Sequence, residues 1–327
     1  MSADGALPAP DADELATDLA ALRSGAALFE RPADLLELTG PDRLRLLQGL
    51  VTADVKAAAP GTAVGGFFTS GQGRILADFQ LLALPEGCWL VLPAGIGETI
   101  RTHLEKYKIA SRVEISLVAD RSLLELRGPR ASEVATAAGG LLSAEDEPWT
   151  MFAGGGRLFL LPKASPSGEP LTSWVRPERS SEVRQVSAAA VELARIEDGE
   201  LVFGVDFSAE NFPQETGREG DVSYTKGCYL GQEVVARIHY RGGVQRQPRG
   251  LRFGGGQAPA AGTELLLEGR AVGRATSVAR SLLHGAIGLG LLHKRGTEIG
   301  TMLEVAGGES AEVVALPFEA NKKNEAG

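Results

Sequence analysis

Two stretches of the chain, 88 residues apart, repeat one pattern of hydrophobic and polar positions. "LLELTGP" at 35–41 recurs as "LLELRGP" at 123–129, with six of seven positions identical. Each copy begins as an apolar, strand-like run, ends in Gly-Pro, and is followed by a helical pattern whose first position suits proline. Coincidence in a leucine-rich chain is the alternative, but the shared order of elements favours an internal duplication.

Each copy is then followed by further strand-like runs separated by glycine turns. After the first come "GGFFTS", the turn "GQG", "RILADFQLLAL" and "CWLVLP"; after the second come "WTMFA", the turn "GGG" and "RLFLLP". Short strands joined by tight turns, with a helix in each set, are typical of antiparallel sheets. The pattern therefore predicts two related α+β units with mostly antiparallel sheets.

The remaining segments have simpler patterns. Asp11 is a candidate N-cap for a short amphipathic helix, residues 165–185 resemble a polar loop, and "SAAAVELARIEDG" predicts a helix that ends near Gly199. From Gln247 onward, short β-like runs alternate with glycine turns, which predicts a small all-β sandwich or barrel of about 75 residues. The predicted division is a flexible leader (1–25), a first α+β unit (26–117), a second (118–245), a C-terminal β-barrel (246–318) and a flexible tail (319–327).

Composition and charge narrow the class of protein. The chain has 327 residues, a net charge of −9 and 42 glycines, which suits a turn-rich globular protein and argues against non-specific nucleic-acid binding by the whole surface. No apolar run reaches the roughly 18–20 residues that span a membrane. The acidic N-terminus lacks a targeting pattern, and two cysteines make no disulfide framework, so we expect a reduced, cytoplasmic protein without a metal site.

One segment concentrates candidate chemistry: "YTKGCYLGQEVVARIHYRGG" at 224–243. Cys228 lies between glycines, two residues after Lys226 and just before a predicted helix that opens at Gly231. A helix N-terminus and a lysine both favour a thiolate, which would lower the pKa of Cys228. Cysteine is also a common packing residue, so reaction and packing remain equal alternatives. The β-branched run that starts at Val234 leaves a strand as the alternative to the helix.

The same segment is locally basic. Between Tyr224 and Arg252 six cations face one anion, Glu233; the cations are Lys226, Arg237, Arg241, Arg246, Arg249 and Arg252. Such a run is either a solvated surface or a site for an anionic ligand. The chain lacks the sequence patterns of the common RNA-binding and phosphate-binding modules, so direct nucleic-acid binding is not expected.

"KGCYLGQEVVAR" at 226–237 strongly resembles the signature of the YgfZ family of folate-binding proteins, which are related to the glycine-cleavage T-protein, an aminomethyltransferase. Further similar stretches are "LLELTGPDRLRLLQGLVTADV", "GQGRILADFQLL", "KYKIASRVEI", "ARIEDGELVFGVDF" and the C-terminal β runs, so the resemblance covers about residues 25–318. It implies three parts in a ring around a central cavity that holds tetrahydrofolate or a one-carbon derivative. It also implies a role in assembling or repairing iron–sulfur proteins, including a tRNA-methylthiolating enzyme, with those proteins or their assembly factors as partners.

The resemblance also implies a set of site residues. Cys228 would be a functional thiol, and the cavity would be lined by Lys226, Tyr229, Gln232, Glu233, Arg237, Asp78, Arg74, Arg195 and Glu197. One departure matters: aminomethyltransferases carry two adjacent acids in the first hairpin, where this chain has Ala77 followed by Asp78. A carboxylate there is expected to direct proton transfer, so its partial loss argues against that reaction. Asp78 could instead pair with Arg74 or bond the pterin.

Three functions remain in competition. The first is a folate-binding accessory factor in iron–sulfur protein maintenance that requires Cys228. The second is a folate-dependent aminomethyltransferase on another substrate, with Asp78 as its discriminating residue. The third, less well supported by the residues, is an RNA-binding module that uses the basic segment.

Overall fold

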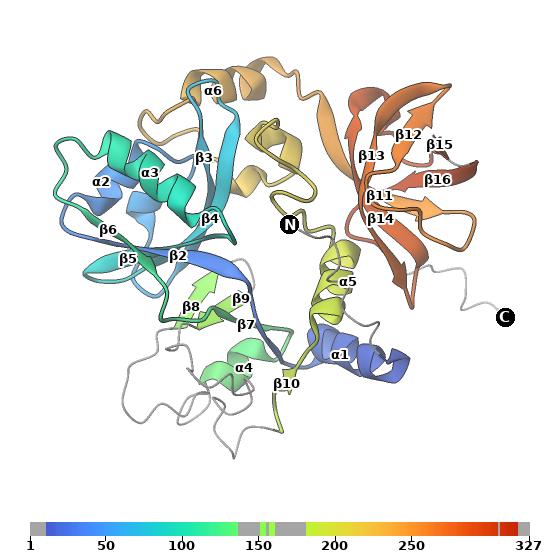
Figure 1. Ribbon diagram of the computed structural model, residues 1–327, viewed down its shortest axis with the longest axis horizontal. Helices are drawn as coiled ribbons and strands as arrows, with labels where there is room; N and C mark the ends of the chain where they lie inside the picture. The colour runs from blue at the N-terminus through green and yellow to red at the C-terminus, as the bar shows by residue number, and fades with distance from the viewer. Residues whose placement is uncertain (1–10, 137–150, 155–156, 161–180, 307, 320–327) are drawn as a thin grey trace. The chain divides into compact units, whose positions relative to one another are not determined.

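The computed structural model describes residues 11–136, 151–154, 157–160, 181–306 and 308–319 (Figure 1). The chain divides into two compact units, each made of separate stretches. Unit 1 comprises residues 1–31, 122–151 and 156–194; unit 2 comprises residues 32–121, 152–155 and 195–327. The division differs from the predicted one, because residues 195–245 group with the first α+β segment and residues up to 31 group with the second.

Unit 1 is built around a short mixed sheet. Its elements are α1 (Ala12–Ser24), β1 (Ala27–Glu30), β7 (Leu124–Arg127), α4 (Ala131–Thr136), β9 (Arg157–Leu160), β10 (Arg184–Gln185) and the first part of α5 (Ala188–Asp198). Among the described residues the strand order is β10-β1-β7-β9-β8, with β8 at Met151–Gly154. β10 runs parallel to β1, whereas β1 with β7 and β7 with β9 are antiparallel.

The N-terminal helix is an ordered part of unit 1. Asp11 accepts a hydrogen bond from the Asp13 amide, which confirms the predicted N-cap, and the helix buries Leu19 and Asp18. Asp18 bonds Arg184 and the Ser187 amide, whereas the flexible leader over residues 1–25 stays a prediction. Most of the predicted 165–185 loop, the leader up to residue 10 and the tail from residue 320 lie outside the described residues.

The first α+β segment of unit 2 is a sheet flanked by helices. It contains β2 (Ala33–Thr39), α2 (Arg43–Gln48), a 3₁₀ turn η1 (Val55–Ala57), β3 (Ala63–Thr69), β4 (Ile75–Ala83), β5 (Gly87–Pro93), α3 (Gly97–Tyr107) and β6 (Glu114–Val118). The sheet order is β3-β4-β5-β2-β6, and each strand runs antiparallel to its neighbours. Alternating burial along β4 packs one face against α2 and α3, as the period-two pattern requires.

The duplicated motif has the same local structure in both copies. Gly40 and Gly128 have φ of +96° and +110°, and a Cβ on either would collide with a backbone carbonyl. Each glycine ends a strand, and a helix follows. The prolines occupy the turn before the helix rather than its first position, because α2 begins at Arg43 and α4 at Ala131.

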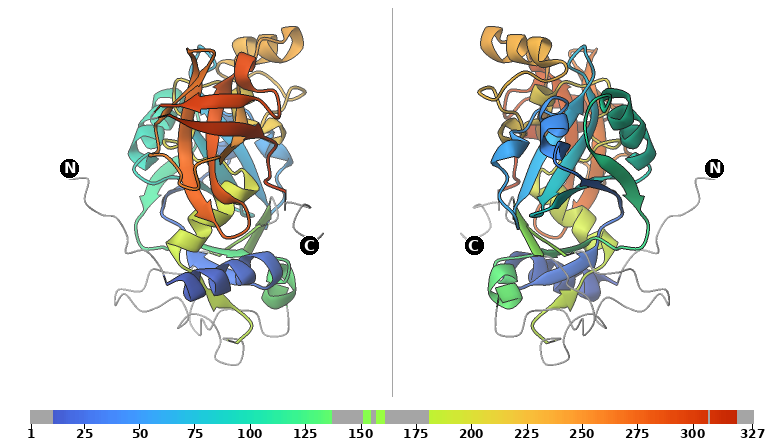
Figure 2. Two further views of the ribbon diagram at one scale, coloured as in Figure 1. Left: turned by 90° about the vertical axis from the view of Figure 1, so that its right-hand side faces the viewer. Right: turned by 90° about the vertical axis from the view of Figure 1, so that its left-hand side faces the viewer.

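The C-terminal part of unit 2 is the predicted barrel. Its strands are β11 (Arg246–Phe253), β12 (Glu264–Leu267), β13 (Arg270–Ser281), β14 (Gly285–His293), β15 (Met302–Val305) and β16 (Glu309–Val314), with a 3₁₀ turn η6 (Lys294–Gly296). They close in the order β11-β14-β13-β12-β15-β16, since β11 pairs with both β14 and β16. Figure 2 shows this barrel in red and orange from the side.

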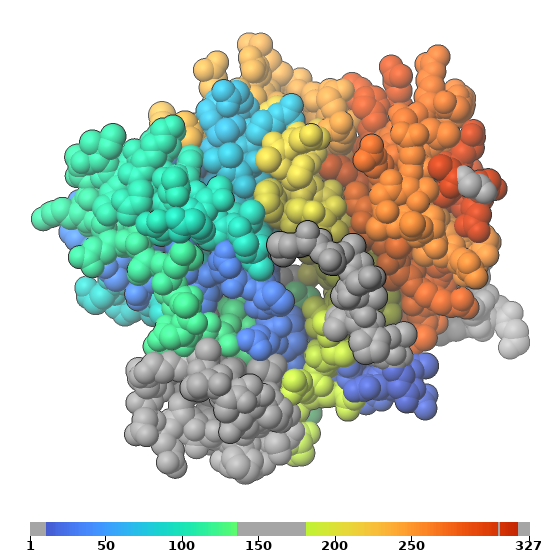
Figure 3. All heavy atoms as spheres, in the orientation of Figure 1, coloured from blue at the N-terminus to red at the C-terminus, as the bar shows by residue number. Residues whose placement is uncertain are grey.

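A connecting segment packs between the first sheet and the barrel. It holds η4 (Pro213–Thr216), η5 (Glu219–Asp221) and α6 (Gln232–Arg241). One hydrophobic cluster joins Phe67 of β3, Phe207 and Val222 of the segment, and Leu291 of β14. The yellow atoms of the segment accordingly lie between the cyan strands and the orange barrel (Figure 3). Among the described residues, no helix is both long enough and apolar enough to cross a membrane.

Candidate functional site

Lys226 anchors the cysteine-bearing loop to the end of α2. Its Nζ donates to the carbonyl oxygens of Gln48 at 2.8 Å, Val51 at 2.6 Å and Ala53 at 2.8 Å. The Gln48 carbonyl belongs to the last turn of α2, where backbone acceptors lack helical partners and a cation is favoured, and the other two carbonyls follow the helix. An ammonium has three donors, and all three are used here. Burial lowers the pKa of Lys226 to about 8, opposed by Asp54.

Tyr229 is the buried half of the same motif. Its side chain is 7% exposed and belongs to the cluster that includes Phe67 and Val235. The Lys226 ammonium lies 4.9 Å from its ring centroid, and burial raises the pKa of the Tyr229 hydroxyl. Gln232 caps the turn by accepting from the Tyr229 amide at 3.2 Å. The buried side chains of Lys226 and Tyr229 therefore fix the loop to the rest of unit 2.

Cys228 lies between these two anchors and is exposed. The backbone on either side is fixed: Ser223 donates its amide to the Thr52 carbonyl at 2.9 Å, and Leu230 donates to the Gly49 carbonyl at 3.0 Å. The second cysteine, Cys88, is fully buried in β5, and burial raises its pKa to about 12. A packing role therefore suits Cys88, whereas Cys228 presents its thiol to solvent on a constrained loop.

The helix predicted after the motif is confirmed. Residues 232–241 form α6, and Gly231 before it has φ of +82° and packs so closely on the Ser70 carbonyl that a Cβ would collide. Gly73, in the β3–β4 turn, similarly faces Val234. The β-branched residues thus pack on the first hairpin, while Glu233 and Arg237 are exposed.

Asp78 pairs with a residue that the sequence did not single out. Arg218 Nη1 lies 2.6 Å from Asp78 Oδ2, and its Nε lies 2.7 Å from Asp221 Oδ2. The Arg218 guanidinium also covers the Phe67 ring at 4.8 Å. The three charged groups form a half-buried cluster between Asp78 of β4 and the connecting segment, which supplies Arg218 and Asp221.

The suggested pairing of Asp78 with Arg74 does not occur. Arg74 instead donates to the Glu210 carbonyl and stacks over the Phe212 ring at 4.0 Å. Its position at the turn before β4 directs it toward residues 210–212. Ala77 is fully buried, so the position of the missing acid faces the core of the sheet.

Arg195 and Glu197 join α5 to the barrel. Arg195 bonds Asp206 at 2.9 Å and the Ser277 hydroxyl at 2.7 Å, and all three side chains are buried. Ser281 donates to Glu197 at 2.6 Å. These bonds involve charged groups that burial would otherwise penalise, so both residues have structural partners.

The structure brings the motif residues Lys226, Tyr229 and Gln232 into one loop and places Cys228 at its surface. Arg218 and Asp206 were missed. Arg218 stands in the polar run "GREGD", which gives no signal, whereas the single acid between Val205 and Phe207 could have marked Asp206 as a buried charge. Among the described residues, His, Cys, Asp and Glu side chains form no cluster of three that could hold a metal.

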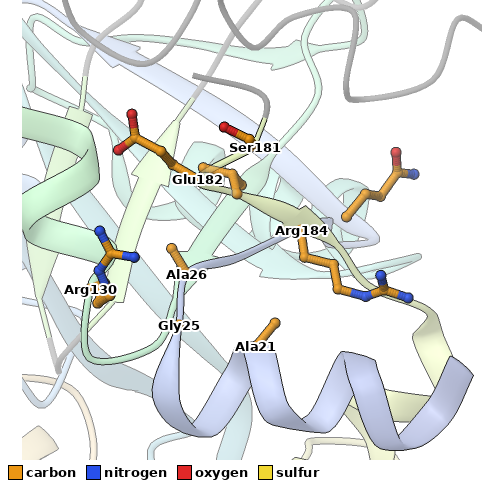
Figure 4. A pocket seen from close by; sticks show the side chains of 9 residues that line it. Ala21, Gly25, Ala26, Arg130, Ser181, Glu182 and Arg184 are labelled. Carbon is orange, nitrogen blue, oxygen red and sulfur yellow. The ribbon is translucent and has the colours of Figure 1, made fainter. Parts of the chain in front are cut away.

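A separate cleft of about 610 Å³ lies in unit 1 between α1 and β10 (Figure 4). Arg130 and Arg184 line it, but they already pair with Glu133 and Asp18. Its lining includes none of the predicted site residues.

Comparison with known proteins agrees with the motif. Residues 9–154 match the family described as the GCVT N-terminal domain. A "tRNA-modifying protein YgfZ" of Yersinia enterocolitica is 30% identical over 242 residues, which cover 71% of this chain and 72% of that protein. The protein of the same name from Pectobacterium carotovorum is 30% identical over 244 residues, which cover 72% of each chain.

The fold agrees as well. The crystal structure of the glycine cleavage system aminomethyltransferase T from Bartonella henselae superposes with a TM-score of 0.78 at 23% identity, over 93% of this chain and 89% of that one. The two proteins share one fold, which in this chain consists of two sheets and a closed barrel. With the Lys-Gly-Cys-Tyr loop in place on this fold, the chain belongs to the YgfZ family.

Proposed function

We propose that this chain is a cytoplasmic, tetrahydrofolate-binding accessory factor in iron–sulfur cluster assembly or repair, and that it affects tRNA modification through that role. The observation that carries the proposal is the exposed Cys228 on a loop fixed by Lys226 and Tyr229. The name "tRNA-modifying protein" of the relatives supports the link to tRNA. The partners would be iron–sulfur proteins or their assembly factors.

Only part of the predicted set of folate-binding residues is free to contact a folate, and Asp78 belongs to that part. Asp78 Oδ2 bonds Arg218, while Oδ1 accepts no hydrogen bond from a described residue and would accept from the amino group of a pterin. Arg237, exposed on α6, would pair with glutamate carboxylates. Lys226 does not fit as a ligand, since its three donors already bind backbone carbonyls. Bound folate would supply one-carbon chemistry.

Isothermal calorimetry with tetrahydrofolate tests the folate half. We expect Asp78→Asn to weaken binding by about tenfold or more, the effect of losing one charge-assisted hydrogen bond. Glu264→Gln, an equal charge change on exposed β12, should bind like the wild type. Absence of heat from the wild type at high concentration would contradict folate binding. Unfolding midpoints of both variants check that the Asp78–Arg218 pair is not needed for folding.

Complementation tests the thiol half. In a strain that lacks its own YgfZ-family protein, Cys228→Ala should fail to restore iron–sulfur enzyme activity, whereas Cys88→Ala should succeed. Equal rescue by both variants would show that the Cys228 thiol is dispensable and would contradict the thiol half of the proposal.

A folate-dependent aminomethyltransferase is the second candidate, and the shared fold favours it. The pairing of Asp78 with Arg218 weighs against it, because one carboxylate oxygen is already bonded and the adjacent acid is replaced by buried Ala77. Folate-dependent release of ammonia from an aminomethylated carrier protein, lost in Asp78→Asn, would favour this candidate over the first.

A further inference from the structure

Three aromatic rings gather at the exposed side of α6. The rings of Tyr224 and His239 stack at 3.7 Å with an interplanar angle of 17°. Tyr240 packs edge-on against His239 at 5.0 Å and is 71% exposed. The exposed ring of a large aromatic residue, next to an existing stack, offers a further planar group a surface on which to stack.

The structure also separates the cations of the basic segment into two groups. Three are engaged: Lys226 is buried, Arg249 donates to the Thr297 carbonyl, and Arg252 lies 3.8 Å from Glu312. The other three, Arg237, Arg241 and Arg246, are exposed and form no ion pair with a described residue. The positive charge that is free for a ligand therefore lies on α6 and just after it.

The exposed tyrosine ring and two of the three exposed arginines lie on the same helix, α6. Arg237, Tyr240 and Arg241 are three and four residues apart, which places them on one side of α6. Figure 2 shows α6 projecting at the top of its unit in both views. Glu233 is the one acidic residue of the helix. In a protein of net charge −9, this is a local cationic and aromatic surface.

We propose that this α6 surface, made of Tyr224, Arg237, His239, Tyr240 and Arg241, binds single-stranded RNA such as an exposed loop. Phosphates would pair with the two arginines, and an unstacked base would lie on Tyr240. An acidic protein would satisfy the arginines but would leave the exposed ring without a planar partner. The choice of RNA over DNA rests on the tRNA-related role proposed above, and Arg237 is the one residue of this surface that the folate proposal also uses.

Fluorescence anisotropy of a labelled 12-nucleotide RNA of mixed sequence, with the full chain, tests the proposal. We expect binding to weaken by about fivefold or more in Tyr240→Ala and to persist in Tyr240→Phe, because stacking needs only the ring. Arg237→Gln with Arg241→Gln should lower the slope of log affinity against log salt by about 1.4, or about 0.7 per phosphate contact.

The matched control is Arg270→Gln with Arg280→Gln, which removes the same charge from exposed positions of β13. It should leave the slope unchanged. An equal loss in this control, or no RNA binding by the wild type, would overturn the proposal. Equal competition by polyglutamate would assign the surface to an acidic protein, and equal affinity for single-stranded DNA would overturn the choice of RNA. Calorimetry with tetrahydrofolate on Tyr240→Ala, a residue outside the proposed folate contacts, should be unchanged, so failure here is distinguishable from failure of the folate proposal.

Discussion

Replacing Lys226 with methionine removes three hydrogen bonds while keeping the length of the side chain. The ammonium donates to the carbonyls of Gln48, Val51 and Ala53 at 2.6 to 2.8 Å. Methionine is apolar and flexible enough to occupy the same space. The variant therefore tests whether the loop of Cys228 is held by these bonds.

The size of the effect follows from two opposing contributions. Three hydrogen bonds to a charged donor contribute about 1.5–3 kcal/mol each, or about 5–9 kcal/mol together. Burial of the charge opposes this: the pKa falls from its usual 10.5 to about 8, a difference of 2.5 that corresponds to about 3 kcal/mol. We expect a net loss of about 2–6 kcal/mol in the free energy of unfolding at pH 7.

Urea unfolding followed by circular dichroism and by tryptophan fluorescence measures the loss, and coincident curves show that one transition is compared. Lys56→Met is the matched control, because Lys56 is exposed and stands three residues after Ala53, one of the three acceptors. It should change stability by less than about 0.5 kcal/mol. A loss that small in Lys226→Met would refute the reasoning and would leave Lys226 free to act on a ligand.

Two further predictions concern titration and thiol chemistry. The folded pKa of Lys226 lies below its unfolded value, so the unfolded chain holds more protons between pH 8 and 10.5 and the contribution of this group to stability rises with pH there. The difference in the free energy of unfolding between wild type and Lys226→Met should therefore increase from pH 8 to pH 10.5. A difference that stays constant would contradict the lowered pKa. For the cysteines, Ellman's reagent should label one thiol in the native protein and two in denaturant, since Cys228 is exposed and Cys88 is buried. Native labelling should vanish in Cys228→Ala; persistent native labelling in that variant would show that Cys88 is accessible.

Local patterns predicted the elements well because their causes are local. The alternation along β4, the glycine after each duplicated strand and the cap at Asp11 depend on neighbours within a few positions. The barrel could be predicted for the same reason, since short β runs separated by glycine turns leave few alternatives.

The partners of the site residues could not be predicted in this way. Asp78 and Arg218 stand 140 residues apart, and Lys226 stands 178 residues from Gln48. Tertiary proximity at such separations depends on the packing of whole elements rather than on any local pattern. The interpretation of Lys226 as a ligand for an anion therefore overlooked three backbone carbonyls, which carry no signal in the sequence.

The bonds of Lys226 also have a consequence for biosynthesis. The Ala53 carbonyl leaves the ribosome 173 residues before the ammonium that it binds. At about 5–20 residues per second, the nascent chain carries these acceptors for roughly 10–35 seconds before the lysine is made. An N-terminal fragment that stops before residue 226 should consequently leave these three carbonyls without their lysine donor. Full-length chains are therefore the appropriate material for expression and binding experiments.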